Sequence, residues 1–125
     1  MFDPDSKHLV IGVVGAGLMG RGIAQIAAQA RIEVWIFDTR AGAADEAVAA
    51  IAATFDTLAA KGKLEAGARD AAVARLRAAT ALADLAGCAL VIEAIVENLD
   101  AKRALFCELE SVVADDCLLA TNTSS

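Results

Sequence analysis

Apolar residues along this chain follow two patterns, short continuous runs and longer stretches with helical spacing. Four short runs that end at glycine or at a polar residue are typical of buried strands, and they cover residues 9–14, 32–37, 89–94 and 117–121. Four longer stretches predict helices, one beginning near Gly17 and the others at about 41–61, 66–78 and 99–113. A weaker extended stretch near Thr80 could add one more strand.

Each predicted helix has one apolar face that should contact the sheet. The faces consist of Ile23, Ile26, Ala27 and Ala30 in the first helix, Val48, Ile51, Phe55 and Leu58 in the second, Val73 and Leu76 in the third, and Leu105, Leu109, Val112 and Val113 in the fourth. Lys61-Gly62-Lys63 interrupts the helical pattern, so the second and third helices should form a hairpin.

The order strand, helix, strand, helical hairpin, strand, helix, strand predicts an α/β fold with a mainly parallel, doubly wound sheet. A length of 125 residues suits a single domain. The polar residues 122–125 follow directly on a core strand, before any helix that would return over the sheet. We therefore expect residues 1–125 to be one domain of a longer protein.

Composition and charge exclude several functions. A net charge of −6 disfavours nucleic acid as a partner, because phosphate binding needs a basic surface. No apolar run approaches the roughly 20 residues of a membrane span, and the first residues lack the basic region of a secretory signal. The cysteines Cys88, Cys107 and Cys117 lack the spacing of a zinc site, so we expect no metal and a reducing, cytoplasmic environment.

A glycine-rich motif stands between the first predicted strand and the first predicted helix. It reads Gly15-Ala16-Gly17-Leu18-Met19-Gly20. In such a motif the first glycine permits a tight turn, the second lets the backbone approach a pyrophosphate, and the third lets helix and strand pack closely. The pattern predicts a Rossmann-type dinucleotide site, with a flexible glycine loop of no binding function as the alternative.

An acidic residue, Asp38, closes the second predicted strand 18 residues after Gly20. A carboxylate at this place can accept both hydroxyls of an adenosine ribose and repels a 2′-phosphate, which favours NAD over NADP. Alternatively, Asp38 could cap the following helix, a role compatible with the first. The neighbouring Arg40 could bind a 2′-phosphate, but it is better explained as a flank of the adenine pocket or as a solvated side chain.

Two further polar stretches follow the later strands. Glu97 comes after the third strong strand, and with Lys102 it could face the nicotinamide half of a dinucleotide. Alternatively, Glu97 only interacts favourably with the helix dipole in the first turn, and Lys102 is an ordinary solvated lysine. Residues 121–125, Thr-Asn-Thr-Ser-Ser, leave the last strand at the same edge and could hydrogen-bond a carboxamide or a substrate hydroxyl. Alternatively, residues 121–125 are a frayed terminus with no binding role.

Three stretches carry a resemblance to a known family. They are residues 13–25 (VVGAGLMGRGIAQ), residues 91–99 (VIEAIVENL) and residues 121–125 (TNTSS). Together with the helical hairpin, they make the chain resemble the NAD-binding domain of the L-3-hydroxyacyl-CoA dehydrogenases. The resemblance covers essentially the whole chain, and its second and third motifs are far more specific than the glycine loop.

The resemblance implies a role for each matching position. The residues implied to bind NAD are Gly15, Ala16, Gly17, Leu18, Met19, Gly20, Asp38 and Arg40 on the ADP side and Ile95, Val96, Glu97, Lys102, Asn122 and Ser124 on the nicotinamide side. Ser124 would also hydrogen-bond the 3-hydroxyl or keto oxygen of the substrate, as the one catalytic residue of the family present here. Thr54 and Lys61 would contact the CoA part of the substrate, on a looser alignment.

The chain departs from the family at its end. The family has a catalytic histidine followed by Phe-Asn-Pro about twenty residues after the serine, then an orienting glutamate, and a helical C-terminal domain that supports homodimerisation. None of these is in this sequence. The resemblance implies a parent enzyme that oxidises L-3-hydroxyacyl-CoA to 3-ketoacyl-CoA in β-oxidation or related metabolism. Its partners would be NAD and acyl-CoA, and this chain alone is expected to be inactive. The alternatives are a β-hydroxyacid dehydrogenase domain and a non-catalytic NAD-binding module.

Overall fold

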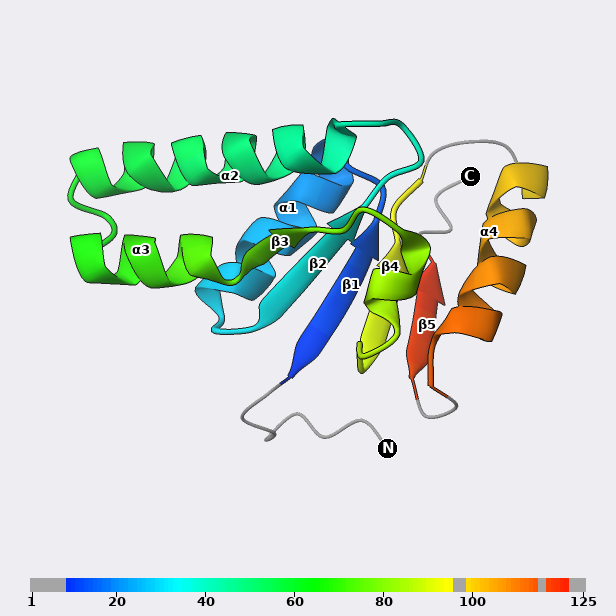
Figure 1. Ribbon diagram of the computed structural model, residues 1–125. Helices are drawn as coiled ribbons and strands as arrows, with labels where there is room; N and C mark the ends of the chain where they lie inside the picture. The colour runs from blue at the N-terminus through cyan, green and yellow to red at the C-terminus, as the bar shows by residue number, and fades with distance from the viewer. Residues whose placement is uncertain (1–8, 96–98, 115–116, 122–125) are drawn as a thin grey trace.

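The computed structural model describes residues 9–95, 99–114 and 117–121, which form one parallel sheet with helices on both faces (Figure 1). The strands are β1 (Val10–Val14), β2 (Glu33–Phe37), β3 (Leu76–Ala78), β4 (Leu90–Glu93) and β5 (Leu118–Thr121). The helices are α1 (Leu18–Gln29), α2 (Ala43–Ala60), α3 (Ala66–Ala74), the short 3-10 helix η1 (Leu82–Leu85) and α4 (Leu99–Val112). The predicted α/β, doubly wound, Rossmann-type fold is confirmed, and every strand pair is parallel.

The sheet order β3-β2-β1-β4-β5 creates a switch point beside the first strand. The chain leaves β1 toward β2 on one side and later returns to β4 on the other. The register pairs Val14 at the end of β1 with both Phe37 of β2 and Glu93 of β4, so the carboxyl ends of these strands lie level at one edge. In open α/β sheets, ligands bind in the crevice at such a point.

Two hydrophobic clusters cover the two faces of the sheet. One joins β1 and β2 to α1 and to the α2–α3 hairpin around Phe55, which is completely buried. The other joins β4 to η1 and α4 around Leu85 and Leu109. The apolar face predicted for α2 is confirmed, since Ile51 and Phe55 are buried and the flanking Val48 and Leu58 are partly buried.

The predicted face of α1 is wrong in two positions. Ile26 is 70% exposed and Ala30 is also exposed. The residues that α1 buries are instead small: Gly20, Ala24, Ala27 and Ala28. Small side chains let the helix axis approach the sheet closely, and this rotates the bulkier isoleucine to the flank of the contact.

The helix predicted over residues 66–78 ends early. α3 stops at Ala74, and Leu76–Ala78 forms β3, which pairs with β2 through Val34 and Leu76. Leu76 therefore lies in the core as a strand residue, because pairing with the sheet edge overrides the local helical tendency of an alanine-rich segment. The additional strand suspected near Thr80 exists, but it lies just before that residue, and η1 was not predicted.

Candidate cofactor-binding site

The glycine loop links β1 to α1 at the switch point of the sheet. Gly15 has a left-handed φ of 116°, and its N–H donates to the carbonyl of Phe37 at 2.8 Å. A Cβ atom on Gly15 would lie 3.1 Å from the carbonyl carbon and oxygen of Ala94, beyond the end of β4. The turn thus passes between the ends of β2 and β4 in a space and a conformation that suit glycine.

The two remaining glycines of the motif have opposite surroundings. A Cβ on Gly20 would lie 1.8 Å from the carbonyl oxygen of Gly15, so this position admits only glycine. A Cβ on Gly17 would meet nothing within 4 Å, which shows open space above the loop. Gly17 is also the N-cap of α1, whose first internal hydrogen bond runs from the Arg21 N–H to the Gly17 carbonyl at 2.9 Å. An open, exposed helix amino terminus is the environment that a pyrophosphate requires.

Asp38 is held against the glycine loop from the end of β2. Its Oδ2 accepts the N–H of Ala16 at 2.8 Å, and its Oδ1 accepts the N–H of Arg40 at 2.8 Å. A carboxylate offers about four acceptor positions, so both oxygens retain capacity for ribose hydroxyls. The alternative in which Asp38 caps α2 is wrong, because the N-cap residue of that helix is Gly42.

The guanidinium of Arg40 lies on the surface beside α2. It forms an ion pair with Glu46 at 3.3 Å, and the two side chains are 66% and 60% exposed. The backbone of Arg40 contributes more to the site than its side chain does, since its N–H fixes one oxygen of Asp38.

Glu93 is a functional candidate that the motif spacing does not predict. Its side chain is completely buried at the carboxyl end of β4, and it is the one buried charged residue in the part of the chain that the structure describes. It accepts the N–H of Ile95 and so fixes the start of the connection from β4 to α4. The available signal was a charge at the end of an otherwise apolar strand.

The other predicted NAD-binding residues divide into two groups. Leu18 and Met19 are exposed beside the loop, at 91% and 46%, and Ile95 is partly buried beyond β4. Val96, Glu97, Asn122 and Ser124 lie outside the described residues, and of Lys102 only the backbone, within α4, is described. The predicted approach of Glu97, Lys102 and Ser124 to a nicotinamide therefore stays a prediction.

The residues predicted to contact CoA lie on α2, away from the glycine loop. Thr54 is exposed and its hydroxyl donates to the Ala50 carbonyl at 3.1 Å, while the exposed Lys61 is the C-cap of the helix. The 18 residues of α2 extend about 27 Å at the usual helical rise. Figure 1 shows the α2–α3 hairpin projecting beyond the sheet, with the end of α2 far from the loop.

The fold and this site define a dinucleotide-binding domain of the Rossmann type. Its features are the parallel sheet with a switch point, the open loop at the start of α1 and the anchored carboxylate of Asp38. A family model described as the NAD-binding domain of 3-hydroxyacyl-CoA dehydrogenase matches residues 10–125. The chain belongs to this family, and its cofactor is NAD.

Individual relatives agree with the family. The chain is 43% identical over 114 residues to a probable 3-hydroxybutyryl-CoA dehydrogenase of Deinococcus radiodurans, with 91% of this chain and 41% of that protein covered. It is 40% identical to a probable 3-hydroxyacyl-CoA dehydrogenase of Caenorhabditis elegans, with 96% and 41% covered. The crystal structure of (S)-3-hydroxybutyryl-CoA dehydrogenase from Ralstonia eutropha superposes with a TM-score of 0.87 at 37% identity, over 93% of this chain and 41% of that one. The chain thus spans about two fifths of these relatives.

Two properties of the described residues bear on other functions. No helix among them has the length and apolar character needed to cross a membrane. Within the same ranges, no group of three or more histidine, cysteine or acidic side chains is placed to hold a metal ion.

Proposed function

We propose that this domain serves an enzyme that oxidises an L-3-hydroxyacyl-CoA to the 3-ketoacyl-CoA with NAD, in fatty-acid β-oxidation or related acyl-CoA metabolism. The observation that carries the proposal is the switch-point site, where an open glycine loop and an anchored Asp38 meet in a chain of this family. Relatives named 3-hydroxybutyryl-CoA dehydrogenase and fatty acid oxidation complex subunit alpha support the reaction and the pathway.

The described residues of the chain bind and orient the cofactor. Backbone N–H groups at the start of α1 bind the pyrophosphate, and Asp38 accepts the hydroxyls of the adenosine ribose. Glu93 keeps the connection after β4 in place through the Ile95 N–H. NAD, when bound, supplies the acceptor for the hydride that leaves the substrate.

The remaining assignments rest on the family resemblance. Glu97 and Lys102 face the nicotinamide, and Ser124 hydrogen-bonds the 3-hydroxyl oxygen and so positions the reacting carbon. Thr54 and Lys61 line the path of the CoA handle along α2. Proton removal belongs to a histidine outside this sequence, and the full-length enzyme works as a cytoplasmic homodimer held together by a further, helical domain.

Two measurements test the proposal. Calorimetric titration of the 125-residue chain should show NAD binding in preference to NADP. The full-length protein should reduce NAD with (S)-3-hydroxybutyryl-CoA, while residues 1–125 should not, since general-base catalysis alone is worth about 10²–10⁴-fold.

The other outcomes identify the alternatives. Full-length protein that oxidises a free β-hydroxyacid but no CoA thioester would be a β-hydroxyacid dehydrogenase. Binding of NAD without oxidation of either substrate would indicate a non-catalytic module. Turnover by residues 1–125 at ordinary enzyme rates would contradict the assignment of the base outside this chain.

A further inference from the structure

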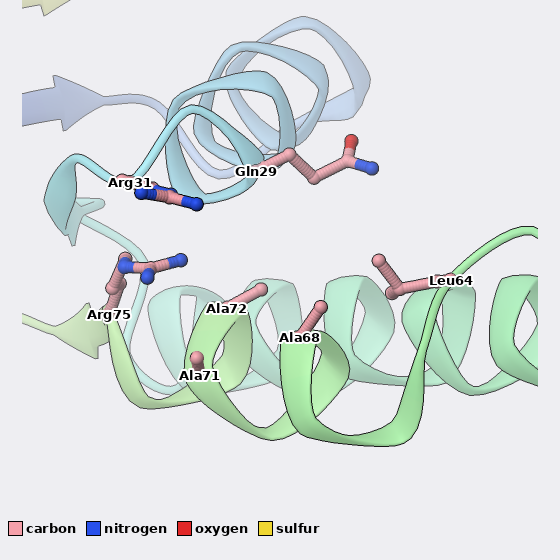
Figure 2. A pocket seen from close by; sticks show the side chains of 7 residues that line it. All are labelled: Gln29, Arg31, Leu64, Ala68, Ala71, Ala72 and Arg75. Atoms are coloured by element: carbon pink, nitrogen blue, oxygen red, sulfur yellow. The ribbon is translucent and has the colours of Figure 1, made fainter.

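A concave site lies at the end of α1 that is remote from the glycine loop. It is a hollow of about 400 Å³ between the end of α1 and α3, and Figure 2 shows its lining. The lining residues are Gln29, Arg31, Leu64, Ala68, Ala71, Ala72 and Arg75. Helix α1 starts at the loop and runs 12 residues, about 18 Å, before it reaches this hollow. A ligand bound here would therefore not overlap NAD.

The side chains of Arg31 and Arg75 both lie at one end of the hollow. Arg75, the C-cap residue of α3, donates from Nη1 to the Ala28 carbonyl at 2.9 Å, and the backbone N–H of Arg31 donates to the same oxygen at 3.2 Å. In Figure 2 the two arginine side chains lie one above the other with their nitrogen ends turned the same way.

These two cations lack a counter-charge within the described ranges. No carboxylate there lies within 4.0 Å of either guanidinium, although the chain carries 17 acidic residues against 11 basic ones. Arg40, Arg69 and Arg77 each form an ion pair, whereas Arg21, like Arg75, donates to a backbone carbonyl. The hollow thus holds two guanidinium groups that have no carboxylate partner in the described ranges, and a bound anion would pair with them.

The backbone of Arg31 points to a role for its side chain. Its φ of 69° is left-handed, in the turn that ends α1, where the Ile32 N–H also donates to the Ala27 carbonyl at 3.0 Å. Helices usually carry glycine at this position, since other residues are strained there. An arginine is less favourable than glycine in this conformation. Its presence here therefore indicates a role for the guanidinium.

Most of the remaining lining is apolar. Leu64 and Ala68 form one wall and the buried Ala72 lies at its base, while Gln29 adds an amide at the rim. Alanine side chains leave room for a bound group, and the volume lies in the range of small-molecule sites. Paired guanidiniums at one end and an aliphatic wall at the other match a ligand with an anionic head and an apolar body.

We propose that this hollow binds a phosphate monoester, with the phosphate on Arg31 and Arg75 and the organic group against Leu64 and Ala68. Guanidinium forks match phosphate oxygens in geometry as well as in charge. The site would give the domain a second small-molecule ligand, independent of NAD and of the proposed reaction.

Phenyl phosphate is the probe for a calorimetric titration of the chain already saturated with NAD. We expect binding under these conditions, at least tenfold weaker binding of inorganic phosphate, which lacks the apolar group, and weaker binding of benzoate, which lacks the phosphate. Binding to the NAD-free chain that disappears once the chain is saturated with NAD would overturn the proposal, because the probe would then occupy the glycine loop. Absence of binding to either form would overturn it as well. Equal affinity for inorganic phosphate would overturn the assignment of the apolar wall.

Arg31→Gly is the decisive variant because it favours the left-handed turn while it removes one guanidinium. It should lower the affinity for phenyl phosphate at least tenfold and raise the melting temperature, so a loss of binding could not be ascribed to unfolding. Arg103→Gln, which removes one exposed positive charge on α4, is the matched control and should bind as the parent chain does. Unchanged binding by Arg31→Gly, or an equal loss in both variants, would refute the site.

Discussion

Substitution of two glycines in the same loop should separate folding from cofactor binding. In Gly20→Ala the new Cβ would lie 1.8 Å from the Gly15 carbonyl oxygen, whereas real Cβ atoms stay at least 3.0 Å from such a neighbour. The Gly15 oxygen is a backbone atom next to β1, and the new Cβ is bonded directly to the backbone of α1, so neither can rotate away and the loop must shift by more than an ångström. We expect a loss of about 3 kcal/mol or more in unfolding free energy, the upper part of the range for overpacked sites. For a domain of this size the melting temperature should fall by about 10 °C.

Gly17→Ala is the matched control. Its Cβ would meet nothing within 4 Å, and the residue is exposed, so the melting temperature should stay within a few degrees of the parent value. The same methyl group would occupy the space in which the pyrophosphate approaches the backbone, so NAD affinity should fall at least tenfold. Thermal unfolding and calorimetric titration of both variants provide the test. A Gly17→Ala variant that binds NAD normally would place the cofactor elsewhere, and a stable Gly20→Ala variant would contradict the packing described for the loop.

Three further predictions concern single side chains near the site and in the core. Asp38→Ala should weaken NAD binding about tenfold to a hundredfold and reduce the preference for NAD over NADP, because charge-assisted hydrogen bonds to the ribose are lost. Titration with both dinucleotides measures this effect. Unchanged selectivity would show that Asp38 does not contact the ribose. Glu93→Ala should lower the free energy of unfolding, measured with urea, by about 3 kcal/mol, because it leaves the Ile95 N–H without its acceptor. Glu93→Gln should recover most of that loss. Equal losses in both variants would show that the hydrogen bond is not the cause. Burial raises the pKa of the Cys88 thiol from 9.0 to about 12, so the unfolded chain loses this proton at lower pH than the folded one. Unfolding free energy should therefore fall as the pH rises from about 9 toward 12, and Cys88→Ala should flatten that fall in denaturation curves at pH 8 and pH 10.5.

The elements that the sequence predicted well are those whose local pattern and tertiary contacts agree. The strands around the switch point are short apolar runs with no competing helical periodicity, and Phe55 lies on a face of α2 that faces the sheet as its spacing requires. The roles of Gly15 and Gly20 were also predictable, because a turn between a strand and a helix that must pack together leaves little choice of residue.

The failures occur where tertiary structure overrides local preference. Residues 76–78 lie in an alanine-rich, helix-favouring segment, but the edge of β2 offers hydrogen bonds that a continued helix would leave unmade. The predicted face of α1 holds at Ala27 and fails at Ile26, because the glycine loop brings the helix so close to the sheet that small residues fill the contact. It fails at Ala30 because that residue is already the C-cap of the helix. Periodicity gives the spacing of a helical face but not how near the sheet lies.

The bonds of Asp38 and Glu93 could not be predicted from the sequence, and they change how the site is understood. Motif spacing assigns Asp38 to a ribose, yet in the structure its Oδ2 first holds the Ala16 N–H of the loop. Glu93 likewise holds the Ile95 N–H after β4, and Ala94, between the two residues, borders Gly15. One carboxylate therefore fixes the loop from the β2 side and another fixes the neighbouring connection from the β4 side. The site is preorganised by its own acidic residues, so its geometry should precede cofactor binding and not depend on it.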